Sequence, residues 1–174
     1  MKYVDQNSNK SWYLIYTKPR QEKLAQDNLE RQGYMTYLPL IQKKHKRNGK
    51  HVAVIEAFFP RYLFISLNTT TDNWSPIRST LGVANIVRFT QYPTVVSDSL
   101  VSLLMSNEDP DTGLYNEDFN FKSGDNVRIT DGALAGYEGF FKARSGEERV
   151  VVLLTVMGNQ TAVKVDVDAL ELVT

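Results

Sequence analysis

The sequence predicts an α+β protein in which an α/β sandwich on an antiparallel sheet is followed by an acidic linker and a small five-stranded β-barrel. Strands and helices alternate over the first part of the chain, which favours the sandwich. Residues 108–118 contain five acidic side chains and no basic one, which is typical of a linker. Short strands with glycines between them follow, and this pattern favours a barrel. We expect a disordered tail over 1–11, the first domain over 12–107, the linker over 108–119 and the barrel over 120–174.

The first domain opens with a strand, a helix and a second strand. Trp12 to Thr17 is aromatic and apolar, which is typical of a buried strand. Pro19 ends this strand and suits the first turn of a helix over 20–32. Gly33 is the expected C-cap of that helix, and Tyr34 to Leu38 is the second strand.

A β-hairpin follows. Its arms, Leu40 to Arg47 and Lys50 to Phe58, meet at Asn48-Gly49, the residue pair that a two-residue hairpin turn prefers because both positions need a positive φ. The remaining expected elements are a strand over 62–67, a short helix over 72–80, a strand over 83–89 and a helix that begins at Ser97.

The barrel is predicted from five short β-prone segments, which are Val127–Thr130, Gly139–Ala143, Arg149–Val156, Thr161–Val167 and Leu170–Val173. Many of their residues are valines, whose branched side chains favour strands over helices.

Several classes of function are excluded or disfavoured by the residues. The chain has no cysteine, so disulfides, thiol nucleophiles and cysteine metal sites are absent. His45 and His51 lack nearby carboxylate partners, no Walker-type loop is present, and no nucleophile stands beside a base. We therefore expect no enzyme activity, no cofactor and no metal. The N-terminus lacks a signal-peptide core and no apolar run can span a bilayer, so we expect a cytoplasmic protein without a membrane partner.

Charge is distributed unevenly. Residues 1–107 contain 14 lysines and arginines against 7 aspartates and glutamates, so this domain can approach nucleic acid. The hairpin tip is densest in charge and carries Lys43, Lys44, Lys46 and Arg47. A solvated face and a phosphate-binding tip explain this cluster equally well.

Three stretches together resemble the NusG/RfaH family of transcription elongation (antitermination) factors. They are Trp12 to Lys23; Phe58 to Phe64 followed by Leu81-Gly82-Val83 and Val87-Arg88-Phe89; and Gly124 to Gly139, which looks like a KOW motif. The resemblance implies an N-terminal NGN domain that binds the clamp helices of RNA polymerase and suppresses pausing and termination. It also implies a monomer whose C-terminal KOW barrel recruits a small-subunit ribosomal protein, termination factor Rho, or both.

The resemblance also assigns roles to aromatic residues. Tyr16, Tyr62, Phe64 and Phe89 fall where the family places its polymerase-binding patch. Aromatic side chains suit such a patch because they dominate interface energetics. Strand aromatics are also common in cores, and period two allows one face of the strand to be core and the other interface. Given the resemblance, we favour the patch.

A second set of residues is placed against the non-template DNA strand by the same resemblance, and it consists of Lys18, Arg20, Arg78 and Thr80. Leu81 and Asn28 stand where well-known members of the specialised branch carry Arg and His. In the KOW domain, Ile129 and Leu134 are the expected partner contacts.

Glu56 and Arg149 fall where autoinhibited relatives make an ion pair between the domains. In those relatives the C-terminal domain folds as a helical hairpin over the patch. The valines favour a barrel on a free linker, and the helical hairpin is kept as the alternative.

Two further readings of the function stay open. We favour a specialised paralogue that acts at a subset of operons, because the first two family-like stretches resemble that branch. The alternatives are a general housekeeping elongation factor and a ribosome-associated RNA-binding KOW protein. The last is opposed by charge, since residues 119–174 carry 6 bases against 8 acids.

Overall fold

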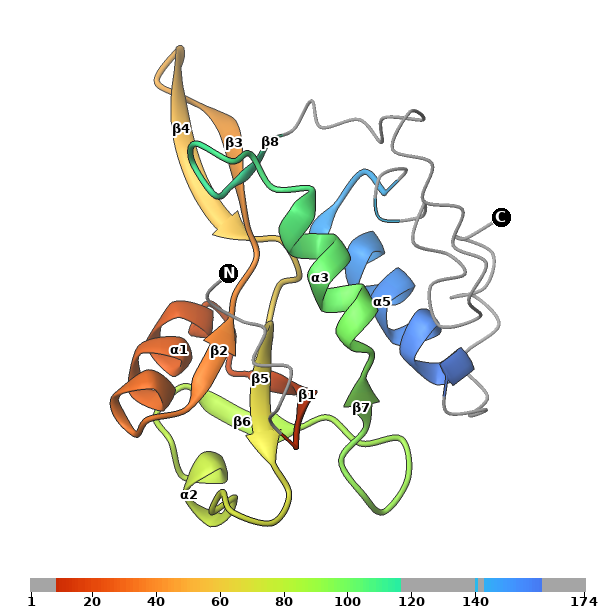
Figure 1. Ribbon diagram of the computed structural model, residues 1–174. Coiled ribbons are helices and arrows are strands. Elements are labelled where there is room, and N and C mark those ends of the chain that lie inside the picture. The colour runs from red at the N-terminus through yellow and green to blue at the C-terminus, as the bar shows by residue number, and fades with distance from the viewer. Residues whose placement is uncertain (1–8, 117–139, 141–142, 161–174) are drawn as a thin grey trace.

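The computed structural model describes residues 9–116, 140 and 143–160 (Figure 1). Its main sheet has the order β2-β5-β1-β6, with β7 also paired to β1. The sheet strands are β1 (Lys10–Thr17), β2 (Met35–Tyr37), β5 (Tyr62–Asn68), β6 (Val83–Ile86) and β7 (Val95–Val96). All the pairings in this sheet are antiparallel, so the α+β class and the antiparallel sheet predicted for the first domain are confirmed.

Two helices cover one face of this sheet. They are α1 (Glu22–Arg31) and α2 (Ser75–Arg78). In β5, Leu63 and Ile65 point to this face, as the two-residue period of a strand requires. The buried residues here form what we call the α1/α2 core: Tyr13, Ile15, Ala25, Leu29, Leu38, Leu63, Ile65, Leu67, Ile77, Val83 and Ile86.

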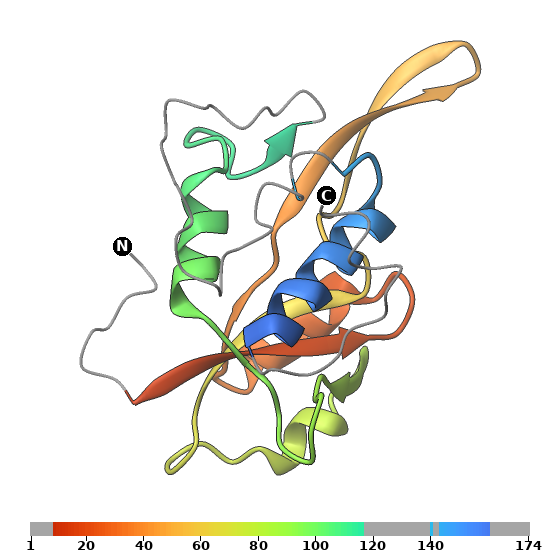
Figure 2. The ribbon, with the colours of Figure 1, turned by 90° about the vertical axis from the view of Figure 1, so that its right-hand side faces the viewer.

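The opposite face carries α3 (Asp98–Ser106) and α5 (Gly146–Gln160), which Figures 1 and 2 show beside the sheet. Phe64 of β5 and Leu14 of β1 point to this side. The buried residues form the α3/α5 core: Trp12, Leu14, Tyr37, Ile41, Phe58, Phe59, Phe64, Val96, Leu100, Val101, Leu104, Tyr115, Phe140, Val152, Leu153, Val156 and Met157.

The predicted hairpin is confirmed. β3 (Leu40–Arg47) and β4 (Lys50–Ala57) pair without interruption from Leu40–Ala57 to Arg47–Lys50. Asn48 and Gly49 close it with φ values of 50° and 78°, the left-handed conformations that an Asn-Gly turn supplies. The hairpin projects from the rest of the molecule (Figure 2).

The part of the predicted linker that the structure describes is anchored rather than free. Tyr115, in β8 (Tyr115–Asn116), is buried, and its ring stacks on Phe58 at a centroid distance of 4.3 Å. β8 pairs in parallel with β3, with Tyr115 opposite Ile41. Glu108 accepts a hydrogen bond from the Tyr37 hydroxyl. Aromatic burial therefore overrides the acidic composition from which a free linker was predicted.

The strand predicted over Arg149–Val156 is wrong, because these residues lie within α5. The helix is stabilised at its start by Ser145, whose hydroxyl accepts a hydrogen bond from the Glu148 amide at 3.1 Å. Its apolar side is buried in the α3/α5 core, and tertiary packing of this kind outweighs intrinsic strand propensity. The other four predicted barrel strands lie outside the described residues, apart from Phe140 and Ala143.

Candidate functional site

Two of the predicted patch residues, Tyr16 and Tyr62, lie side by side at the junction of β1 and β5. Their ring centroids are 5.1 Å apart, and the Arg61 guanidinium lies 4.2 Å above the Tyr16 ring. The Arg61 Nε also donates to the Thr17 carbonyl at 3.0 Å, which fixes the side chain. Burial raises the pKa of the Tyr62 hydroxyl, so this group stays neutral and can donate or accept a hydrogen bond at physiological pH.

The other two patch residues belong to the α3/α5 side of the sheet. Phe64 is fully buried, with its ring stacked on Tyr37 at 5.8 Å and edge-on to Phe59 at 6.1 Å. Phe89 is half-buried and packs against the same core. Three of the four predicted aromatics, including Tyr62, are thus brought to one face of the sheet.

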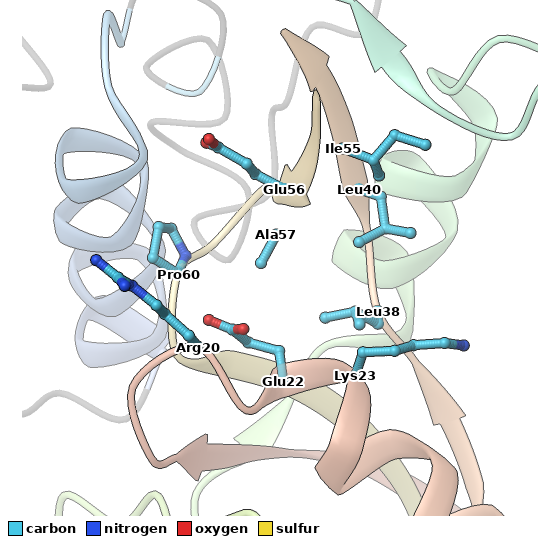
Figure 3. Close-up of a pocket in the computed structure, with 9 residues that line it drawn as sticks. All are labelled: Arg20, Glu22, Lys23, Leu38, Leu40, Ile55, Glu56, Ala57 and Pro60. Carbon is cyan, nitrogen blue, oxygen red and sulfur yellow. The ribbon is translucent and has the colours of Figure 1, made fainter. Parts of the chain in front are cut away.

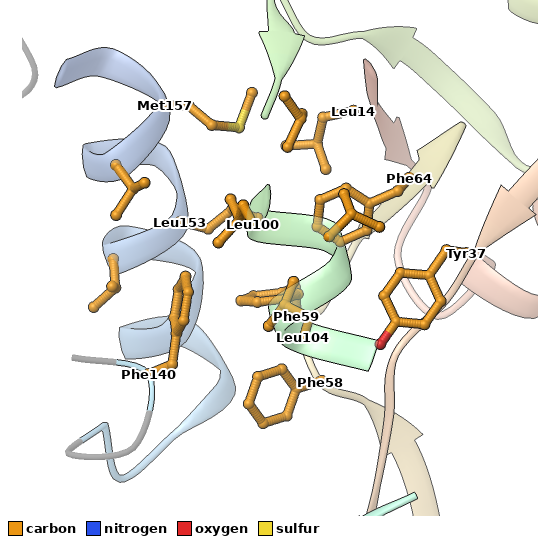
Figure 4. Close-up of a cluster of buried hydrophobic side chains, with 14 of the residues drawn as sticks. Leu14, Tyr37, Phe58, Phe59, Phe64, Leu100, Leu104, Phe140, Leu153 and Met157 are labelled. Atoms are coloured by element: carbon orange, nitrogen blue, oxygen red, sulfur yellow. The ribbon is translucent and has the colours of Figure 1, made fainter. Parts of the chain in front are cut away.

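α5 covers that face. Val152, Leu153, Val156 and Met157 are buried along one side of the helix, and Phe140 packs edge-on against Phe59 at 5.4 Å (Figure 4). The arrangement is an apolar face of a β-sheet occupied by an apolar helix.

The start of α5 is seated closely on the loop before β5. A Cβ atom placed on Gly146 would lie 2.5 Å from the Pro60 Cγ, so only glycine allows this approach. The Ser145 hydroxyl accepts from the Glu148 amide in the first turn, and the Glu148 carboxylate accepts from the Arg144 amide, just before the helix, at 2.6 Å.

Arg149 lies near the start of α5 and is buried, with 3% of its surface exposed. Its Nε donates to the Phe58 carbonyl at 2.7 Å, and its guanidinium lies 4.5 Å over the Phe58 ring. Its Nη2 has no hydrogen-bond partner among the described residues. Burial lowers the pKa of Arg149, while the nearby charges of Glu56 and Glu148 act in the opposite direction.

The predicted pair of Glu56 with Arg149 is therefore a longer-range attraction. In the described part of the chain, Glu56 makes an ion pair with Lys43 at 3.5 Å and a hydrogen bond with the His45 Nε2 at 3.0 Å. The prediction that His45 lacks a carboxylate partner is therefore wrong, because the hairpin register brings together two residues that are eleven positions apart.

The predicted nucleic-acid residues fall on two exposed surfaces. Lys44, Lys46 and Arg47 are exposed on the outer half of the hairpin, whereas Lys43 is half-buried. Lys18 and Arg20 are exposed just after β1, and Arg78 is exposed at the end of α2.

The second of these surfaces is assembled by backbone contacts. The Lys18 amide donates to the Gly82 carbonyl at 2.9 Å, which joins the segment after β1 to the turn after α2. Thr80 is only 6% exposed, and its hydroxyl accepts from Gln32 at 2.8 Å and donates to the Pro76 carbonyl at 2.9 Å. Thr80 therefore holds this turn rather than presenting its hydroxyl to nucleic acid. Ile129 and Leu134 lie outside the described residues.

One feature that sequence reasoning missed is a pocket of about 450 Å³ at the base of the hairpin (Figure 3). No motif marks it, because its walls come from α1, the hairpin and the loop before β5. Its lining residues are Arg20, Glu22, Lys23, Leu38, Leu40, Ile55, Glu56, Ala57 and Pro60.

The described part of the chain holds no cluster of three or more histidine, aspartate or glutamate side chains suited to a metal ion. None of its helices is long and apolar enough to span a membrane.

Comparison with known proteins identifies the family. The family model described as transcription termination factor NusG matches residues 10–105, which is more than half of the chain.

Three proteins named transcription termination/antitermination protein NusG are similar along most of their length. The one from Rickettsia prowazekii (strain Madrid E) is 21% identical over 173 residues, covering 94% of this chain and 90% of that protein. The one from Deinococcus radiodurans is 27% identical over 180 residues, covering 89% and 95%. The one from Bacillus subtilis (strain 168) is 24% identical over 170 residues, covering 90% and 95%. The chain therefore belongs to the NusG family of transcription termination/antitermination factors.

Proposed function

We propose that this chain is an elongation and antitermination factor that binds the clamp helices of RNA polymerase, and that α5 closes its binding face until it is recruited. The observation that carries the proposal is the burial of the aromatic face by α5. Tyr62, Phe64 and Phe89 pack in or against the α3/α5 core, and Tyr16 lies beside Tyr62 at its margin.

The chemistry of the covered face supports a helical partner. Four side chains of α5 are buried in it, and burying a side chain of this size contributes about 1.5–3 kcal/mol. Such a face is costly to leave exposed, so α5 and the clamp helices compete for it. In this view α5 occupies the groove in the way that helices bind apolar grooves in general.

The closed state, in which α5 covers the aromatic face, has features that reduce its stability. Arg149 brings a charge into the interface, and its Nη2 has no partner among the described residues. A buried charge without full pairing costs free energy. The valines of α5 also have lower helix propensity than alanine or leucine. Both features make docked α5 less stable, so that replacing it by another helix costs less free energy.

We further propose the fate of the released segment. Residues 120–174 then form a five-stranded KOW barrel, and Ile129 and Leu134 contact a small-subunit ribosomal protein, Rho, or both. The exposed side chains of Lys18, Arg20 and Arg78 support contact with the non-template DNA strand. Lys44, Lys46 and Arg47, with Lys43 at their margin, support contact with a phosphate backbone.

The covered face also favours one subtype over the other. A general factor acts at most genes, so it needs a polymerase-binding face that is always accessible. A face closed by α5 suits a monomeric, cytoplasmic paralogue that acts at a subset of operons, where a recruiting signal opens it.

The first test compares polymerase binding by the full chain and by the variant Leu153→Asp, which places a charge in the α3/α5 core. We expect Leu153→Asp to bind core polymerase more tightly, because the apparent dissociation constant falls as the fraction of competent molecules rises. Leu81→Asp is the matched control, since Leu81 is 61% exposed and lies outside both cores. Equal or weaker binding by a folded Leu153→Asp protein contradicts closure by α5.

The second test asks whether the uncovered aromatics make the contact. In the Leu153→Asp background, Tyr62→Ala is expected to weaken polymerase binding by about 1–3 kcal/mol, as is typical of an interface aromatic. Circular dichroism checks that the domain stays folded. If Tyr62→Ala unfolds the domain, Tyr62 is a core residue and the patch assignment fails.

A further inference from the structure

Within the part of the chain that the structure describes, the outer strand of the hairpin has an open edge. In the sheet ordered β4-β3-β8, β4 has a neighbour on one side only among the described residues, as Figure 1 shows. Its middle, Val52 to Ile55, contains no charge and no proline, and the pairing with β3 has no bulge. Proteins usually protect such an edge with one of these devices. Val52 is 40% exposed and Ile55 is 55% exposed.

The turn determines which backbone groups of β4 face this edge. In a two-residue hairpin the residues that flank the turn, here Arg47 and Lys50, exchange hydrogen bonds. Bonding pairs then alternate along an antiparallel ladder. Val52 and Val54 therefore bond to β3, whereas the N–H and C=O groups of His51, Ala53 and Ile55 point to the open edge.

The pocket of Figure 3 lies at the base of the same strand. Leu40, Ile55 and Ala57 line it, and the register places them on one face of the hairpin, since Leu40 is opposite Ala57 and Gln42 is opposite Ile55. Leu38 and Pro60 extend its apolar wall. A strand added to β4 would direct every second side chain to this face, so that one of them would enter the pocket.

Cationic side chains continue this face toward the tip. Lys44 is opposite Ala53, and Lys46 is opposite His51. Ala53 is small, so the long Lys44 side chain can reach across it to a strand on the far side of β4. Carboxylates at alternate positions of an added strand would meet these lysines.

We propose that the edge of β4 binds an extended, acidic segment of a protein partner by strand addition, with an apolar side chain in the pocket at the hairpin base and carboxylates at alternate positions toward the tip. Nucleic acid could bind the same lysines, but it would not pair with the outward amides of the edge or pack on the apolar wall of the pocket, which Leu38, Leu40 and Ile55 help to form. The edge and the pocket together therefore select a peptide. This surface adjoins the start of α5 at Pro60 but contains none of the four patch aromatics, so the proposal does not depend on polymerase binding.

The probe is a fluorescein-labelled peptide with leucine near one end, glutamate at three successive alternate positions and threonine in between, titrated into the full chain. We expect saturable binding, followed by fluorescence anisotropy. Hydrogen–deuterium exchange resolved by residue gives the distinguishing signature. The amides of His51, Ala53 and Ile55 become protected, while those of Val52 and Val54 do not change.

Three changes separate the contribution of the pocket from that of the outward amides of β4. Ile55→Ser removes an exposed apolar wall of the pocket and is expected to weaken binding at least tenfold. Leu81→Ser changes an apolar residue of similar exposure elsewhere, 61% against 55% for Ile55, and is expected to leave binding unchanged. Ala53→Pro removes an outward amide without removing a bond to β3 and is expected to abolish binding. A peptide N-methylated at alternate residues tests the same bonds without altering the protein, which covers the case in which Ala53→Pro disturbs the hairpin.

Three outcomes overturn the proposal. The first is that a single-stranded oligonucleotide of equal charge binds and the peptide does not, which makes the hairpin a nucleic-acid site only. The second is that the N-methylated peptide binds as well as the unmodified one. The third is that Ile55→Ser and Leu81→Ser behave alike, which removes the pocket from the interaction.

Discussion

At the scale of single residues, the four patch aromatics show where sequence reasoning ends. The two-residue period of β5 correctly separates Tyr62 and Phe64 from Leu63 and Ile65. It does not reveal which side is core, because both sides are covered in this structure. That answer depends on α5, which is distant in sequence. The choice between core and interface is thus a question about α5 rather than about the strand.

The free-energy cost of burying the charged Glu108 carboxyl can be measured from the pH dependence of protein stability. Burial raises the pKa of its carboxyl above the ordinary value of 4.5, and the hydrogen bond from Tyr37 only partly opposes this. The folded state therefore holds the proton more tightly than the unfolded chain does. Its charged form reduces stability above the folded pKa, and this loss disappears as pH falls through that pKa toward 4.5.

We predict that Glu108→Gln, which keeps an acceptor for Tyr37, is more stable than the parent protein at neutral pH. The difference in the free energy of unfolding should shrink as pH is lowered through the raised pKa. Urea unfolding at a series of pH values measures it. Glu147→Gln, at an exposed carboxyl, is the control for removing a negative charge. A gap that widens toward acid pH contradicts the assignment.

At the scale of elements, the first domain was predictable because its signals are local. The apolar run of β1, the proline before α1 and the Asn-Gly turn each specify structure from a few neighbouring residues. A helical C-terminal segment was only the alternative prediction, because the valines favour a strand and α5 is stabilised by its contacts with a sheet face that is distant in sequence. One local signal was overlooked, which is the capping-box pattern Ser145-x-x-Glu148 ahead of the valines. The pocket and the open edge of β4 carry no sequence signal, since both arise from the packing of separate segments.

The same cap yields a prediction for the helix. Ser145→Ala removes the acceptor of the Glu148 amide, and losing an N-cap of this kind costs about 0.5–2 kcal/mol. The loss should destabilise docked α5 specifically. Faster hydrogen exchange of the α5 amides, with unchanged exchange in β1 and β5, is the expected result. Ser102→Ala is the control, because Ser102 is exposed on α3. Equal effects of the two changes would mean that the cap does not govern the helix.

At the scale of the whole molecule, the sheet separates two cores, and only one of them depends on residues of the C-terminal segment. The α1/α2 core is built entirely from residues before position 87, whereas the α3/α5 core needs five residues from position 140 onward. Removing α5 therefore opens one face of the sheet and leaves the other packed. Regions of a protein with separable cores open at separate free energies. Such a molecule can uncover a binding face without unfolding.

This division predicts two tiers in native-state hydrogen exchange across a denaturant series. The amides of residues 152–157 should exchange through a partial opening of low free energy, because only the contacts on the α3/α5 side are lost. The amides of Leu63 and Ile65 on β5 should require an opening of higher free energy, since the α1/α2 core and the β1 pairing both hold them. Leu153→Asp should lower the first value and leave the second nearly unchanged. If one free energy instead describes all these amides, α5 is a cooperative part of a single core. Its release would then unfold the sheet, and a face exchanged between α5 and a partner would not be available.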